Sequence, residues 1–271
     1  MVNKMLWLGT GGGRICSYLQ ARATGGLILN LQGYQIHIDP GPGAIVRTRQ
    51  YKISPEKTDI VILTHCHTDH VNDALIILEA MSSGNVKKKG TVISNKTCMF
   101  GYEDFDPVVH RYIKKNLKNV YVLEPKGKIE FESNLKITAT KTEHDDPLAI
   151  GIKFEFNNKK ISVVGDTSYF KGLAKEHEGA QILILNVLRP SNLRWKGHMC
   201  TEDAIALVKE INPAVVIIQH FGMKMLSASP TLEARRIHTE TGVDCISAKD
   251  GMSFDVEELL SLAGQKKLTN F

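Results

Sequence analysis

Short apolar runs bounded by Gly, Asn and Pro dominate the first 160 residues of this chain of 271. Runs of this length predict β-strands. The predicted strands cover residues 5–8, 26–29, 35–38, 59–63, 91–94, 120–123, 128–131, 135–140, 150–156 and 160–164. Gln32-Gly33 and Asn157-Asn158 separate consecutive runs and predict hairpin turns. Residues 59–63 are almost continuously apolar, which is typical of a strand buried on both faces.

The last third of the chain alternates predicted strands with predicted helices. The strands here cover residues 181–185 and 214–218, and the helices cover residues 201–210 and 230–241; a first helix, with Asn72 as its cap, is predicted earlier in the chain at residues 73–81. Glu202 and Asp203 suit the start of the second helix, while Pro230 and Gly242 suit the two ends of the third. Strands in both halves with helices outside them predict an α/β fold of two sheets packed face to face, with helices on the outer faces.

Composition describes an ordinary globular protein, with 42% hydrophobic and 23% charged residues. This excludes global disorder, and the lack of an apolar run of about 18 residues excludes a membrane-spanning helix. The first residues lack the apolar region of a signal peptide, so a cytoplasmic protein is expected. Without a Pro/Gly/Ser-rich linker, we expect one domain over residues 1–271, with a polar tail after Gly264 that frays.

Charge and cysteine content narrow the function. The formal net charge of +5 is compatible with an anionic substrate but far from that of a dedicated nucleic-acid-binding protein. The five cysteines are scattered and form no C-x-x-C pair. We therefore expect buried free thiols instead of a disulfide framework or a cysteine-rich zinc site.

A histidine-rich segment, Thr64-His65-Cys66-His67-Thr68-Asp69-His70, directly follows the buried strand at 59–63 and precedes a helix. Each of these polar tips needs a partner in a crowded turn, and bound metal ions would supply it. The alternation of side-chain directions along this segment places His65 and His67 on one side and Asp69 and His70 on the other, which suits two neighbouring metal ions.

This segment resembles the H-x-H-x-D-H signature of the metallo-β-lactamase superfamily. The resemblance runs from Gly9-Thr10-Gly11 to about Lys224, with Asp39 similar to the structural acid of the family. It implies an αββα sandwich of two mixed sheets. It also implies seven metal ligands, which are His65, His67, Asp69, His70, His144, Asp166 and His220.

By this resemblance, one metal ion would be held by His65, His67 and His144. The second would be held by Asp69, His70 and His220, and Asp166 would bridge the two. Imidazole and carboxylate ligands favour zinc, although manganese or iron would also fit. Two such cations lower the pKa of a shared water toward about 7 and stabilise developing charge, so the expected activity is hydrolysis with Asp69 as a catalytic residue.

His198 is the second predicted catalytic residue, because Gly197-His198-Met199-Cys200-Thr201 resembles the His-Ser-Thr segment of the ribonuclease Z and cyclic phosphodiesterase branch. There this histidine helps to stabilise or protonate the scissile phosphate, whereas a capped loop histidine is the structural alternative. The neighbouring cations and aromatic ring suit a phosphate with an attached base or sugar, although a solvated basic loop is the alternative. The predicted substrate-binding residues are Arg189, Arg194, Trp195, Lys196 and Lys224.

Two departures from ribonuclease Z favour a smaller substrate than transfer RNA. His144 and Asp166 lie only 22 positions apart, so the long arm that ribonuclease Z inserts there is absent. Asn186 stands where the family places a glutamate that partners the helper histidine. A small anionic phosphodiester is therefore the expected partner, and RNA and a homodimer remain open.

Other functions use the same ligand set. Lactonases and thioesterases of the superfamily share all seven ligands, and a metal-bound binding module without catalysis is a further alternative. A redox di-iron protein is disfavoured, because such members usually carry Glu at the position of His67. Gly9-Thr10-Gly11-Gly12-Gly13-Arg14 is not a dinucleotide-binding fingerprint, because Arg14 replaces the third glycine and no helix is predicted after it. Four histidines lack ligand-like neighbours and are expected to be structural: His37, His110, His177 and His238.

Overall fold

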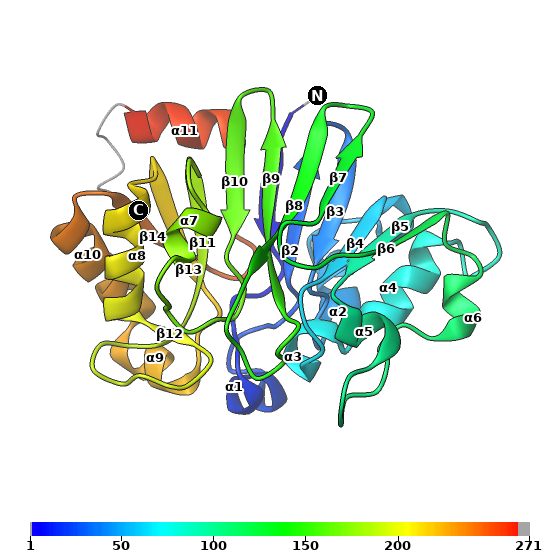
Figure 1. Cartoon of the computed structure of the whole chain (residues 1–271), viewed down its shortest axis with the longest axis horizontal. Helices are drawn as coiled ribbons and strands as arrows, with labels where there is room; N and C mark the ends of the chain where they lie inside the picture. The colour runs from blue at the N-terminus through cyan, green and yellow to red at the C-terminus, as the bar shows by residue number, and fades with distance from the viewer. Residues whose placement is uncertain (1, 265–271) are drawn as a thin grey trace.

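The computed structural model describes residues 2–264 and consists of two mixed β-sheets that face each other (Figure 1). The first sheet has the order β15-β1-β2-β3-β4-β5-β6. Its strands are β1 (Lys4–Trp7), β2 (Leu27–Leu31), β3 (Tyr34–Ile38), β4 (Ile60–Leu63), β5 (Thr91–Ser94), β6 (Asn119–Val122) and β15 (Ser253–Asp255). The predicted α/β fold is confirmed.

The second sheet has the order β14-β13-β11-β10-β9-β8-β7, and the short β12 pairs with β11. Its strands are β7 (Lys128–Phe131), β8 (Leu135–Lys141), β9 (Ile150–Phe156), β10 (Lys159–Val163), β11 (Ile182–Arg189), β12 (Met199–Cys200), β13 (Val215–Gln219) and β14 (Asp244–Ser247). Strands β9 and β10 form a hairpin that occupies most of the chain between His144 and Asp166.

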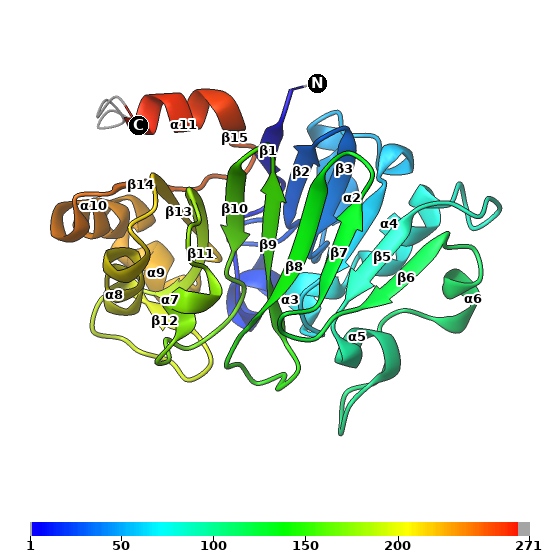
Figure 2. The ribbon, with the colours of Figure 1, turned by 45° about the horizontal axis from the view of Figure 1, so that its top comes forward.

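Helices cover both outer faces, and α11 lies across one end of the molecule (Figure 2). The helices are α1 (Arg14–Leu19), α2 (Ala44–Gln50), α3 (Thr68–Val71), α4 (Ala74–Met81), α5 (Lys96–Phe100), α6 (Arg111–Lys114), α7 (Leu173–Glu176), α8 (Thr201–Ile211), α9 (Met223–Ala228), α10 (Pro230–Thr241) and α11 (Val256–Gly264), with a 3₁₀ turn at Pro55–Lys57. Helices α4, α5 and α6 pack on the first sheet, and α7 to α10 pack on the second.

Alternating residues of the central strands enter different hydrophobic cores. In β4, Ile60 and Ile62 pack between the two sheets, whereas Val61 and Leu63 pack under the outer helices. All four side chains are buried, which explains why the sequence of this strand is continuously apolar. Strand β11 has the same division, with Ile182 and Ile184 in the central core and Leu183, Leu185 and Val187 under the outer helices.

Both predicted hairpin turns are present, with the left-handed backbone that tight turns require. Gln32 and Gly33 have φ of 52° and 88°, and Asn157 and Asn158 have φ of 43° and 60°. Glycine and asparagine tolerate this conformation better than other residues, which is why these dipeptides were informative.

Two local predictions were wrong. Asn72 does not cap the helix at 73–81: the histidine-rich segment itself continues into α3, so Asp73 occupies the cap position of α4. A helix does follow the glycine run, because α1 begins at Arg14. It is only six residues long, and its exposed Ile15 and Leu19 give no amphipathic pattern. The predicted fraying of the tail falls on residues 265–271, outside the described residues.

The candidate site lies where neighbouring parallel strands end. Strands β3 and β4 are parallel, as are β10, β11 and β13, so the carboxyl ends of each set meet at one edge of its sheet. The segments after these ends carry most of the predicted ligands. Among residues 2–264, no helix has both the length and the hydropathy needed to cross a bilayer.

Candidate metal centre

One carboxylate oxygen is surrounded by imidazole rings. The Oδ2 atom of Asp166 lies 3.8 Å from Nε2 of His65 and 3.4 Å from Nε2 of His70. The same oxygen lies 3.9 Å from Nε2 of His144 and 3.3 Å from Nε2 of both His198 and His220. These rings come from segments more than 150 residues apart, so the fold has gathered them around Asp166.

The predicted ligands form two compact groups. One potential ligand atom from each of His65, His67 and His144 lies within 4.8 Å of the others, and the same holds for Asp69, His70 and His220. Within each group two ring nitrogens face each other at 3.0 Å, in the pairs His67 with His144 and His70 with His220. The structure therefore places the seven predicted ligands close together, and the same criterion also groups Asp39 with His65 and His70, and Asp166 with His144 and His198.

Close backbone contacts allow this crowding. Gly12 passes directly beneath the His220 ring, and a Cβ atom on Gly12 would lie 2.2 Å from the ring carbon Cγ. His220 itself has φ of 63°, a left-handed conformation that is uncommon for a histidine at a strand end. Strained residues of this kind persist where the surroundings fix them, as the glycine loop does here.

Asp39 determines how two of the rings are protonated. Its Oδ2 accepts a hydrogen bond from Nδ1 of His70 at 2.9 Å and another from the Thr64 hydroxyl at 2.6 Å. Because that hydroxyl donates to Asp39, its oxygen is left to accept from Nδ1 of His65 at 3.1 Å. His65, and His70 in its neutral form, therefore present an Nε2 lone pair to the cluster. This matches the expected structural role of Asp39.

The Nε2 atom of His65 is the clearest sign of a bound cation. It is fully buried and has no hydrogen-bond partner in the part of the chain that the structure describes. A buried lone pair facing a carboxylate oxygen costs free energy unless a positive charge lies between them. The residues present therefore fit divalent metal ions.

Electrostatics favour cations at the same place. Burial and the positive charges of His70 and His144 hold the pKa of His65 well below its usual range, and burial lowers the pKa of His144 to about 4. Burial also acts to lower the pKa of His70, but the charges of Asp69 and Asp166 outweigh it and hold that pKa well above the usual range. The field that attracts a proton to His70 equally attracts a metal cation.

His198 projects into the same centre from a tight turn. Its backbone N–H donates to the Trp195 carbonyl at 3.1 Å, and its Nδ1 donates to the Lys196 carbonyl at 3.2 Å. Burial opposes a charge on the ring, but the hydrogen bond to Asp166 raises the pKa of His198 overall. Asn186 donates to Oδ1 of Asp166 at 2.6 Å.

A cavity of about 710 Å³ opens beside this centre. His67, Asp69, Asp166 and His198 form part of its wall, so the cavity leads to the predicted ligands. Three of the five predicted substrate-binding residues also line it: Arg189, Trp195 and Lys224. The Arg189 guanidinium lies over the Trp195 ring, 4.8 Å from its centroid.

The other two predicted substrate-binding residues lie outside the described wall of this cavity. Arg194 forms an ion pair with Asp203 at 3.0 Å, and its side chain is 74% exposed. Lys196 occupies the middle of the turn that carries His198, and its main contribution is the carbonyl that binds the ring. Neighbours in sequence thus point to different sides of the loop.

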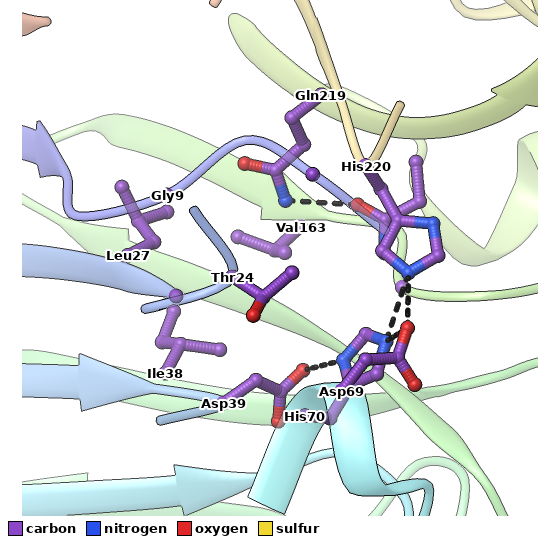
Figure 3. A pocket seen from close by; sticks show the side chains of 14 residues that line it. Gly9, Thr24, Leu27, Ile38, Asp39, Asp69, His70, Val163, Gln219 and His220 are labelled. Carbon is purple, nitrogen blue, oxygen red and sulfur yellow. Dashed lines mark hydrogen bonds and ion pairs between the residues drawn. The ribbon is translucent and has the colours of Figure 1, made fainter. Parts of the chain in front are cut away.

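A second, much smaller cavity of about 40 Å³ lies behind the cluster, between the two sheets (Figure 3). Gln219 and His220 lie on one side of it, and Asp39 and His70 lie on the other. Glycines form much of the rest of its lining: Gly9, Gly11, Gly26 and Gly165.

The model of the beta-lactamase superfamily domain matches residues 34–221, which include every predicted metal ligand. The chain belongs to this superfamily. It is 37% identical over 256 residues to an uncharacterized protein of Methanocaldococcus jannaschii, covering 93% of this chain and 95% of that protein. It is 27% identical over 204 residues to a ribonuclease Z of Borreliella burgdorferi, covering 70% of this chain and 61% of that protein, less than two thirds of its length.

Solved structures of the superfamily share the fold. The metallo-β-lactamase fold protein YhfI from Bacillus subtilis has a TM-score of 0.78 at 19% identity, covering 94% of this chain and 100% of that chain. Membership of this superfamily makes the chain a metal-dependent hydrolase.

Arg14 and Phe105 are among the residues that line the larger cavity without being indicated by the sequence motifs. In the sequence, Arg14 is notable only because it replaces the third glycine of a dinucleotide-binding fingerprint. Phe105 lies in an irregular loop between α5 and α6, with its ring 6.2 Å from the His67 ring. Nothing in the local pattern of that loop indicates its contact with a ligand.

Proposed function

We propose that the protein is a binuclear metal-dependent phosphodiesterase that acts on a small, nucleotide-like phosphodiester. The observation that carries this proposal is the position of Asp166, whose Oδ2 lies between two groups of potential ligands and within 3.3 Å of the His198 ring. His65, His67 and His144 would hold one ion, and Asp69, His70 and His220 the other, with Asp166 between them. Zinc is the proposed metal, because imidazole nitrogens predominate among the ligands.

Two bound divalent ions would supply a hydroxide at neutral pH and neutralise charge on the phosphate. The protein's own residues have separate tasks. His198 would hold a proton on Nε2, near the Asp166 carboxylate, and deliver it to the leaving oxygen. The turn from Trp195 to His198 keeps that nitrogen in place, because both Nδ1 and the backbone N–H of His198 are hydrogen-bonded within the turn.

The substrate class follows from the cavity beside the centre. Arg14, Arg189 and Lys224 place three cations along its wall, which suits an anionic group, and Trp195 offers a planar surface for a base or aryl group. One relative is named ribonuclease Z, and RNA is a polymeric phosphodiester. The chain between His144 and Asp166 is taken up by the β9–β10 hairpin, so a substrate smaller than transfer RNA is favoured.

Metal content and hydrolysis test the proposal together. Purified protein loaded with zinc or manganese is expected to bind two ions per chain and to hydrolyse bis(p-nitrophenyl) phosphate faster than a simple lactone or thioester. Asp69→Ala is expected to abolish hydrolysis and lose metal, whereas Asp104→Ala, in the α5–α6 loop, is the matched control and keeps both. Faster lactone or thioester hydrolysis would favour the second candidate, an esterase of the same superfamily. Binding of fewer than one ion per chain would overturn the metal site.

A further inference from the structure

A chain of side-chain hydrogen bonds reaches Asp166 from the opposite sheet. Trp7 on β1 donates its indole Nε1–H to Oε1 of Gln219, at the end of β13. Gln219 Nε2 then donates to Oδ1 of Asn186 at 2.8 Å, and Asn186 Nδ2 donates to Oδ1 of Asp166 at 2.6 Å. Three side chains from β1, β13 and β11 thus form one path that ends on the carboxylate at the centre of the cluster.

The direction of every bond in this path is fixed by its first member. An indole N–H can only donate, so Gln219 must turn its oxygen toward Trp7 and its NH₂ toward Asn186. Asn186 must then accept through its oxygen and present its own NH₂ to Asp166. An isolated amide could turn either way, whereas here each amide has one orientation that satisfies its neighbours.

Each of the two amides accepts one hydrogen bond and donates another within the path. Asn186 and Gln219 both border the small cavity behind the cluster, and glycines without side chains form much of its remaining wall (Figure 3). The orientation of the two amides is therefore set by the bonds to Trp7 and Asp166 at the ends of the path.

The hydrogen bond at the end of the path gives the two oxygens of Asp166 different partners. Oδ1 receives the N–H of Asn186, and Oδ2 remains directed at the five imidazole Nε2 atoms 3.3–3.9 Å away. We propose that Trp7, Gln219 and Asn186 are positioning residues that hold Asp166 with its Oδ2 directed at the residues that would bind the metal ions. This inference rests on the metal site of the proposed function and adds three residues that the ligand motif does not contain.

Metal affinity in variants of nearly equal size tests the inference. Gln219→Met and Asn186→Leu remove the amides and are expected to weaken zinc binding about 10- to 100-fold, as loss of groups that orient ligands does. The affinity is measured by competition with a chromophoric chelator. Cobalt-loaded protein is expected to show a changed d–d absorption spectrum, because the ligand field at the metal changes. Circular dichroism of the metal-free variants checks that they fold.

Gln35→Met is the matched control. Gln35 lies on β3 and donates to the Ser54 carbonyl at 3.0 Å and the Thr58 hydroxyl at 2.9 Å, away from the metal cluster. Gln35→Met removes the same amide as Gln219→Met, but at a position away from the cluster. This variant is therefore expected to keep the wild-type zinc affinity and cobalt spectrum. A drop in stability alone would therefore be common to both glutamine variants, whereas weaker metal binding would be specific to Gln219.

Gln219→Glu provides a second variant that retains an acceptor for Trp7 but cannot donate to Asn186 when ionised. It is expected to weaken zinc binding at least as much as Gln219→Met. In one outcome, the wild-type protein binds two ions while all the Gln219 and Asn186 variants keep its zinc affinity and cobalt spectrum. That result would overturn this inference and leave the proposed function intact. A wild-type protein that binds no metal would overturn both.

Discussion

The imidazole Nδ1 of His144 donates to the carbonyl oxygen of Gly197 at 2.7 Å, so a proposed metal ligand is bonded to the turn that carries His198. The N–H of Gly197 donates in turn to the Ser168 hydroxyl at 2.8 Å. Gly197 has φ of 77°, and this left-handed position turns the chain tightly enough for His198 to bond back to Trp195. The proposed proton donor, the cavity wall and the proposed metal ligand are thus held in one arrangement.

Replacement of His198 by alanine is expected to lower kcat about 10²- to 10⁴-fold on a phosphodiester with an alkyl leaving group, because the leaving oxygen then lacks a proton donor. The loss is expected to be much smaller with a p-nitrophenyl leaving group, which departs without protonation. Steady-state kinetics on the two substrates, with metal content measured in parallel, check this. An equal loss on both substrates, or loss of metal, would assign His198 to metal binding instead.

The two cations Lys224 and Arg194 are expected to behave differently, although the sequence placed both near the substrate. Lys224 lines the large cavity, so Lys224→Ala is expected to raise KM about tenfold through loss of a charge-assisted contact. Arg194 pairs with Asp203 and is largely exposed, so Arg194→Ala is expected to leave KM unchanged. The measurement is KM for bis(p-nitrophenyl) phosphate in both variants at equal metal loading. A raised KM in Arg194→Ala with an unchanged KM in Lys224→Ala would mean that the substrate approaches over the Arg194 side of the loop.

The sequence predicted twelve of the fifteen strands in residues 2–264, all except β12, β14 and β15, and it singled out the histidine-rich segment, because these features leave local signals. Strand β4 is buried on both faces and is therefore continuously apolar, and the histidine-rich segment begins directly at its end. The short helices α1 and α2 leave no such signal. They have six and seven residues, and their exposed apolar side chains, such as Ile15 and Val46, hide any amphipathic period.

The hydrogen-bond path to Asp166 could not be predicted from the sequence. Trp7 and Gln219 are separated by 212 positions and belong to different sheets. Each stands in or at the end of an apolar strand, where the pattern suggests ordinary packing. Their contact depends on how the sheets face each other, which strand periodicity does not determine.

Gly12→Ala is expected to displace His220 and weaken binding of the metal ion proposed to use it. The added Cβ would lie 2.2–2.4 Å from three atoms of the His220 ring, and the ring must move because the contact is too close for any real Cβ atom. Zinc titration of the purified variant measures the effect, and about one tightly bound ion per chain is expected instead of two.

Gly84→Ala is the control for that variant. Gly84 has φ of 69°, so alanine there is strained by about 1–2 kcal/mol, but nothing lies within 4 Å of its added Cβ. It is expected to lose stability and keep both metal ions. Two tightly bound ions in Gly12→Ala would mean that His220 is not needed as a ligand.

His177 is expected to make the protein less stable as the pH falls. Its ring is fully buried with Nδ1 at 2.6 Å from the Ser162 hydroxyl, and Nε2 has no partner within residues 2–264. Burial, with a smaller effect of the Lys153 charge, lowers the pKa of His177 to about 3. Between pH 6.5 and 3 the unfolded chain binds a proton that the folded protein excludes, so stability falls by about 1.4 kcal/mol per pH unit, and above pH 6.5 this effect vanishes.

His177→Gln removes this titration while keeping a side chain that can hydrogen-bond to Ser162. Between pH 7 and pH 5, its free energy of unfolding is expected to decrease by about 2 kcal/mol less than that of the wild type, measured by urea unfolding in the presence of a chelator. The chelator removes metal from both proteins, so protonation of the metal cluster contributes equally and cancels in the comparison. His110→Gln, on the surface, is expected to keep the wild-type difference. If the free energy of unfolding of His177→Gln decreased between pH 7 and pH 5 as much as that of the wild type, the acid sensitivity would arise from another group.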